Sequence, residues 1–142
     1  MADDQRVLAG LRRALLAVLA VGLAGTAADL VLLAHYEDAL QWAPLVIISV
    51  CLLSVVWHAV SPGAVSLRLM RVSMTSALAG AATGVVLHYR GSMEFQLESD
   101  RSIGGVDLLM KVLTSKAPPT LAPMSLALLG LIGLASTYKE GT

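Results

Sequence analysis

The chain has 142 residues, of which 56% are hydrophobic and 14% charged, and its mean hydropathy is +0.75. Soluble domains carry about 25% charged residues, so this composition excludes an ordinary soluble globule and a disordered chain. The formal net charge of zero argues against a nucleic-acid partner, and the single cysteine excludes an internal disulfide. From the length and the apolar composition we predict one integral membrane domain, 1–142, in a lipid bilayer.

Four apolar segments reach, or nearly reach, the length of about 20 helical residues that a membrane crossing takes. Backbone amides have no partner in lipid, so each segment is predicted to be helical. The expected fold class is an all-α membrane protein with a bundle of four transmembrane helices, at about 14–34, 43–60, 72–87 and 121–138. The first segment could instead be a signal peptide, but its apolar run continues beyond the small residues at 25–28, which favours a retained helix.

The first predicted span contains Asp29, about four residues inside its outer end. A carboxylate within the membrane is costly and marks a functional candidate, so Asp29 is the intramembrane polar candidate of a small oligomeric transporter. The alternative is a structural hydrogen bond between helices, with Thr83 or His88 as the partner. In both cases we expect Asp29 to face the interior of the bundle, together with Gly22 and Gly25.

The second predicted span ends with Trp57 and His58, and a Ser61-Pro62-Gly63 turn follows. Tryptophan and tyrosine gather at membrane–water interfaces, so we interpret His58, beside Trp57, as an anchor at the membrane boundary. Cys51 lies in mid-span, where a thiol behaves as a small apolar side chain.

The third predicted span has a face of small residues, because Ser76, Gly80 and Gly84 recur at four-residue spacing. Such faces let helices approach closely and gain van der Waals contact, which is the main attraction between helices in lipid. We expect Gly80 and Gly84 to be helix-packing positions inside the bundle. The alternative is that they form the interface of a homo-oligomer.

A long outer loop, residues 88–120, follows the third predicted span. Polar and apolar residues alternate over 92–98, which predicts a short strand. Four apolar residues then recur at helical spacing between Val106 and Leu113, which predicts an amphipathic helix lying in the membrane interface. We expect this structured loop, with its short strand and interfacial helix, to be a place where a protein partner docks.

Two histidines, His35 and His88, stand at the outer ends of the first and third predicted spans, and carboxylates follow both. Two imidazoles can bind a haem or a metal ion, so these residues are the cofactor-binding candidates of a redox protein. Their spacing matches no metal-binding motif, and the alternative is that both are hydrogen-bonded boundary residues. No nucleophile–base pair can be placed, so no catalytic residue and no metal ligand is assigned, and an enzyme is not expected.

The basic residues are distributed unequally between the two sides of the predicted spans. The side with both termini has six basic and three acidic residues, whereas the other side has four basic and six acidic residues. Cytoplasmic flanks are rich in Lys and Arg, so both termini are predicted to be cytoplasmic and residues 88–120 external. The six basic residues are Arg6, Arg12, Arg13, Arg68, Arg71 and Lys139.

Two stretches resemble a group of small four-helix bacterial membrane proteins: His35-Tyr36-Glu37-Asp38 with Gln41-Trp42 and Pro44, and His88-Tyr89-Arg90-Gly91. The resemblance covers most of the chain and implies a bacterial inner-membrane location, but no activity or cofactor. The leading hypothesis is a non-enzymatic accessory or assembly subunit that binds a protein partner, or a second copy, through its outer loop or small-residue faces. The alternatives are the redox protein and the transporter.

Overall fold

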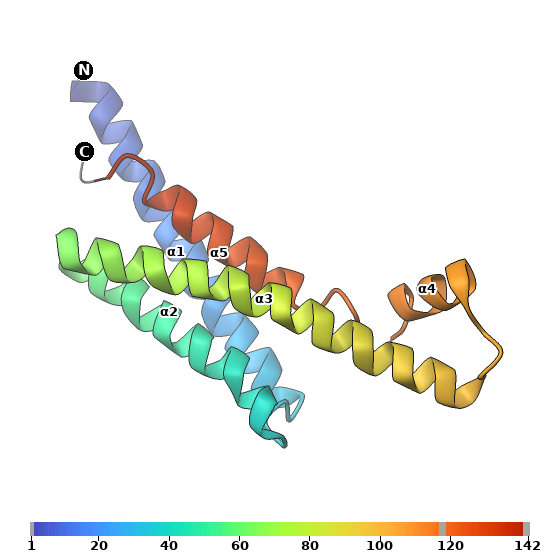
Figure 1. The fold of residues 1–142 in the computed structure, drawn as a ribbon. Helices are drawn as coiled ribbons and strands as arrows, with labels where there is room; N and C mark the ends of the chain where they lie inside the picture. The colour runs from blue at the N-terminus through green and yellow to red at the C-terminus, as the bar shows by residue number, and fades with distance from the viewer. Residues whose placement is uncertain (1, 117–118, 141–142) are drawn as a thin grey trace. The chain divides into compact units, whose positions relative to one another are not determined.

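The structure is a computed structural model that describes residues 2–116 and 119–140. These residues form five α-helices and one 3₁₀-helix and contain no β-strand (Figure 1). The elements are α1 (Ala2–Leu32), η1 (Ala39–Gln41), α2 (Trp42–Val60), α3 (Ala64–Ser99), α4 (Gly105–Leu113) and α5 (Met124–Ser136). They group into two compact units, each described by itself: the bundle unit, Met1–Gly80 with Leu126–Thr142, and the loop unit, Ala81–Ser125.

Three helical segments within the described residues are long and apolar enough to cross a membrane: α1, α2 with the preceding η1, and α3. The predicted fourth span at 121–138 is wrong in length. Its helix, α5, has only 13 residues, whereas a crossing takes about 20. The four-span architecture is therefore corrected to three candidate spanning helices and one shorter apolar helix.

The predicted strand at 92–98 is also wrong, because this segment belongs to α3, which has 36 residues and continues to Ser99. Most residues of the segment, including Met93, Glu94 and Gln96, have high helix propensity. A lone strand would leave its amides unpaired at both edges, whereas continuing the helix gives each amide a carbonyl four residues earlier. The period-two pattern was too short to outweigh these two effects.

The expected amphipathic helix of the outer loop is present as α4. It begins at Gly105, whose φ of +58° lies in the left-handed region that glycine adopts without strain. Asp107 in its first turn and Lys111 in its last turn both interact favourably with the helix dipole. Thr114 ends the helix, where both its N–H and its hydroxyl donate to the carbonyl of Met110.

Close helix contacts in the bundle unit occur at glycines. A Cβ added to Gly80 of α3 would lie 2.7 Å from Ile47 Cδ1 of α2, and one added to Gly22 of α1 would lie 2.5 Å from Leu129 Cδ2 of α5. A methyl group at either position would require the neighbouring side chain to shift, so the helices approach closely there. The large, fully buried side chains of the bundle unit are Leu19, Leu23, Ile48, Val55, Met70 and Met74.

The loop unit contains the second half of α3, α4 and the turn before α5. A Cβ at Gly84 would lie 3.0 Å from Pro123, so this part of α3 contacts the turn closely. The hydroxyl of Thr120 donates to the carbonyl of Val112 at 2.8 Å, and both residues are buried. This bond ties the turn to the end of α4.

Candidate functional site

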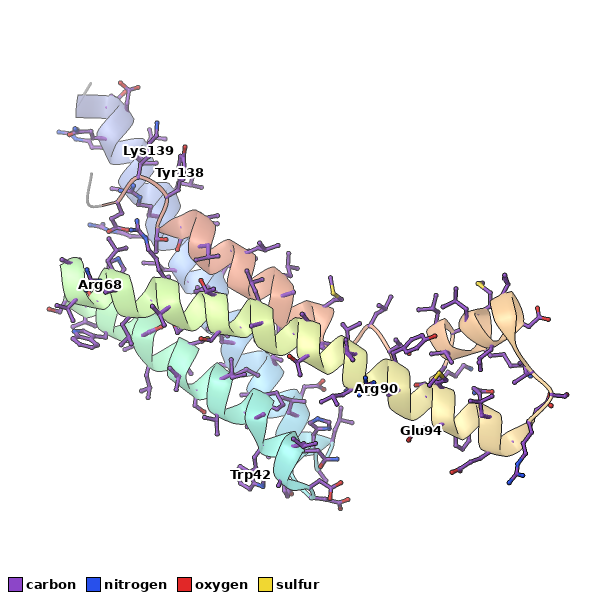
Figure 2. The ribbon with its side chains drawn as sticks, viewed as in Figure 1. Trp42, Arg68, Arg90, Glu94, Tyr138 and Lys139 are labelled. Atoms are coloured by element: carbon purple, nitrogen blue, oxygen red, sulfur yellow. The ribbon has the colours of Figure 1, made fainter. Side chains whose placement is uncertain are left out.

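Polar side chains meet at one end of the bundle unit, where α2 ends, α3 begins and residues 137–140 follow α5. Figure 2 shows Arg68 on the first turns of α3 at this end, and Trp42 at the opposite end of α2. We call this region the arginine end, because Arg12, Arg68 and Arg71 all belong to it.

The turn between α2 and α3 is held by His58 and Ser66. His58 is 4% exposed, and its Nδ1 lies 3.0 Å from Ser66 Oγ. The Ser66 hydroxyl also lies 3.0 Å from the carbonyl oxygen of Ser61 and accepts the N–H of Gly63 at 3.1 Å. His58 is therefore a buried part of a hydrogen-bond network, and its position at the membrane boundary stays a prediction.

The second ring nitrogen of His58 contacts the other end of the chain. Its Nε2 lies 3.2 Å from Glu140 Oε1, and the Glu140 side chain is 27% exposed. Serine, histidine and acid thus stand in the order of a hydrolase triad. Ser66, however, is 2% exposed and its oxygen is occupied by the turn, so it presents no nucleophile to a substrate. The network stabilises the turn between α2 and α3 and holds the Glu140 side chain against His58.

Two arginines hold the backbone that follows α5. Arg71 Nη2 donates to the carbonyls of Thr137 (2.7 Å) and Glu140 (2.9 Å), and Arg12 Nη2 donates to that of Tyr138 (2.8 Å). These carbonyls lie just beyond the C-terminus of α5, where the helix dipole places partial negative charge and favours arginine. Side chains of α1 and α3 thereby hold the backbone after α5 through hydrogen bonds.

A cavity of about 540 Å³ lies beside this network, within the bundle unit. Its wall includes Arg68, Arg71, His58 and Glu140, together with the first residues of α3. A second, apolar groove of about 230 Å³ lies between α2 and α3. Val72 lines both spaces, so the first, which we call the arginine cavity, and the apolar groove adjoin.

A pair of serines joins α2 and α3 further along the bundle unit. Ser54 Oγ lies 2.7 Å from Ser73 Oγ, and both residues are buried. The Cys51 thiol donates to the carbonyl of Ser73 at 3.3 Å. Such contacts give buried polar groups the hydrogen-bond partners that lipid cannot provide, and they add modestly to the free energy of helix association.

The two histidines predicted to bind a cofactor lie in different units. His88 Nδ1 donates to the carbonyl of Pro119 at 2.9 Å in the loop unit. In the bundle unit, the His35 N–H donates to the carbonyl of Leu30 at 2.8 Å after the left-handed Ala34. Among the described residues, no group of three or more His, Cys, Asp and Glu is placed to hold a metal ion. Binding of haem or metal by the two histidines stays a prediction.

Asp29 lies on the exposed side of α1, so the expectation that it faces the bundle interior is wrong. The buried face of α1 is set by Leu19 and Leu23, both fully buried. At 3.6 residues per turn, Asp29 lies about 120° around the helix from Leu23. Gly25 was expected to share a buried face with Asp29, but a Cβ added to Gly25 would have no other atom within 4 Å, so this position is open. A role of Asp29 in transport stays a prediction.

Sequence reasoning did not connect His58, Ser66 and Glu140. The turn residues Ser61 to Gly63 indicate where α2 ends, but a contact across 82 positions leaves no local pattern. Comparisons of the chain with protein-family models, with curated proteins and with solved structures give no match.

Proposed function

We propose that the protein is a small polytopic inner-membrane protein and a non-enzymatic accessory or assembly subunit of a membrane complex. Its three long apolar helices hold it in the bilayer, and its loop unit binds a partner protein. Both termini are proposed to be cytoplasmic. The excess of Lys and Arg on their side supports this orientation, as does the hydrogen bond between Arg12 and the Tyr138 carbonyl, which puts residues near the two termini at one end of the bundle unit.

The observation that carries the proposal is the exposed apolar face of α4. This short helix buries Val112 but leaves four apolar side chains between 41% and 73% exposed. Exposed apolar patches mark sites of protein or membrane interaction. A helix that binds an anionic membrane surface is rich in Lys and Arg, whereas residues 88–120 carry four acids and four basic residues, which favours a protein partner. The four side chains are Val106, Leu109, Met110 and Leu113.

Site-specific photocrosslinking in intact cells tests this proposal. We expect benzoylphenylalanine at Leu109 in the full-length protein to give an adduct with one membrane protein. The same probe at Lys111, about 200° around α4 from Leu109, is the matched control and is expected to give none. Leu113→Glu should remove the adduct, because a charge would be buried at the interface.

Three outcomes would count against this function. Adducts with lipid alone would mean that α4 lies on the membrane, and an adduct with a second copy of the chain would make the protein a homo-oligomer. Equal adducts from Leu109 and Lys111 would mean that the exposed face has no selectivity.

A further inference from the structure

We propose that the arginine end binds an anionic phospholipid, with the phosphate of its headgroup in the arginine cavity and one acyl chain in the groove between α2 and α3. The proposal requires that the bundle unit lies in a bilayer. It does not depend on a partner protein or on the exposed face of α4.

The charges around the cavity favour a phosphate. Arg68 and Arg71 outnumber the single carboxylate, Glu140, and that carboxylate is already held by His58. Arg68 is exposed and forms no hydrogen bond or ion pair with another described residue, so its guanidinium is available to a ligand. Arginine presents a planar set of donors that matches phosphate oxygens.

The second arginine is held in place at the cavity wall. Arg71 uses Nη2 and Nε for its contacts with Thr137 and Glu140, and its Nη1 takes no part in them. These contacts fix the guanidinium before a ligand arrives, which lowers the entropy cost of binding. Gly63 and Ala64 line the same cavity, so the cavity lies at the N-terminus of α3, where the helix dipole places partial positive charge.

The adjoining groove identifies the ligand as a lipid rather than free phosphate. Five of its seven lining residues are apolar: Val46, Ile47, Val50, Leu69 and Val72. From Arg68 to Ser76, α3 advances about 12 Å along its axis, so the groove leads from the charged end toward the middle of the bundle unit. A phospholipid has the same arrangement, because its charged headgroup is followed by apolar acyl chains. Basic pockets between transmembrane helices are known to bind anionic headgroups.

Thermal unfolding of the delipidated full-length protein in a neutral detergent tests the proposal. We expect dioctanoyl phosphatidylglycerol to raise the unfolding midpoint in a saturable way, because it binds only the folded protein. Dioctanoyl phosphatidylcholine and inorganic phosphate should have little effect. Arg68→Ala should weaken phosphatidylglycerol binding about tenfold, as expected for the loss of one charge-assisted contact, whereas Arg68→Lys should weaken it less.

Matched controls separate this site from general charge and general apolar effects. Arg13→Ala removes an exposed arginine of α1 outside the cavity and should leave binding unchanged. Val72→Trp should obstruct the groove and weaken binding, whereas Val21→Trp, at another exposed position, should not.

Four results would overturn the proposal. Equal stabilisation by phosphatidylcholine would mean that charge is not recognised, and equal stabilisation by inorganic phosphate would mean that the site binds a free anion. If Arg13→Ala weakens binding as much as Arg68→Ala, the interaction is a diffuse surface effect. If Val72→Trp binds the lipid as well as Val21→Trp does, the groove holds no acyl chain.

Discussion

Glu140 Oε1 lies 3.2 Å from His58 Nε2, although the two residues are 82 positions apart in the chain. The contact depends on Lys139, whose φ of +52° turns the backbone after α5. Arg71 binds the carbonyl of Glu140 at the same time, so α2 holds the side chain of this residue and α3 its backbone. Residues 137–140 are therefore an integral part of the bundle unit.

The His58–Glu140 contact is expected to stabilise the fold. His58→Phe removes the partner of the partly exposed Glu140 carboxylate and one of several partners of the Ser66 hydroxyl, and should cost about 0.5–1.5 kcal/mol of unfolding free energy. Glu140→Gln keeps a side-chain acceptor near Nε2 and should cost less. Unfolding of the purified protein in mixed micelles measures both changes, with Glu98→Gln, an exposed residue of α3, as the control. A wild-type stability for His58→Phe would show that the network is dispensable.

The glycines of the bundle unit should differ sharply in their tolerance of a methyl group. A Cβ at Gly133 would collide with Met74 and also lie 3.2 Å from Leu19 Cδ2, so Gly133→Ala should destabilise by about 1–3 kcal/mol. Gly80→Ala should cost less, because it meets only the flexible Cδ1 of Ile47. Gly25→Ala, with open space around it, should be neutral or slightly stabilising.

The same unfolding measurement can include a rescue. Ile47→Val removes the atom that a methyl group at Gly80 would meet, so the double variant Ile47→Val/Gly80→Ala should lose less than the two single changes added together. If Gly25→Ala costs as much as Gly133→Ala, then helix packing is not what the glycines provide.

Ala34 is expected to be a position of avoidable strain. It ends α1 with φ +52°, and the bonds from Ala34 N–H to Val31 and from His35 N–H to Leu30 form a Schellman cap around it. An L-residue pays about 1–2 kcal/mol in this conformation, so Ala34→Gly should raise stability by about 1 kcal/mol. Ala28→Gly, within α1, should have the opposite sign. Equal losses from both variants would contradict the left-handed geometry.

The turn after α3 should respond to acid. The hydroxyl (2.6 Å) and the backbone N–H (3.0 Å) of Ser102 donate to Asp100, and these bonds lower the pKa of its carboxyl because they stabilise the charged form. Since the folded-state pKa is lowered, the stabilisation is complete above the ordinary carboxyl pKa and disappears as the pH falls through the lowered pKa.

The amide resonance of Ser102 in a pH titration followed by NMR reports this change. Ser102→Ala should move the midpoint to higher pH, whereas Ser99→Ala, whose hydroxyl bonds to the Phe95 carbonyl instead, should not. An unchanged midpoint in Ser102→Ala would mean that this hydroxyl does not stabilise the carboxylate.

Local patterns predicted elements better than they predicted orientation or contacts. The uninterrupted apolar run at 43–60 corresponds to α2, because a long charge-free stretch before a Pro-Gly turn has few alternatives. Residues 92–98 were misassigned because seven alternating residues cannot outweigh a helix that is already formed. The rotation of α1 was inferred from Gly22 and Gly25 together. Gly22 does contact α5, but Gly25 has open space around it, and Leu19 and Leu23 are the fully buried residues of α1.

The contact between His58 and Glu140 also sets an order of events during synthesis. Glu140 is made 82 residues after His58, which at about 5–20 residues per second corresponds to roughly 4–16 s. During that interval α2 and the start of α3 exist without the residue that completes the network. A chain that stalls before residue 140 would therefore lack the contact that links the end of α2 to the segment after α5.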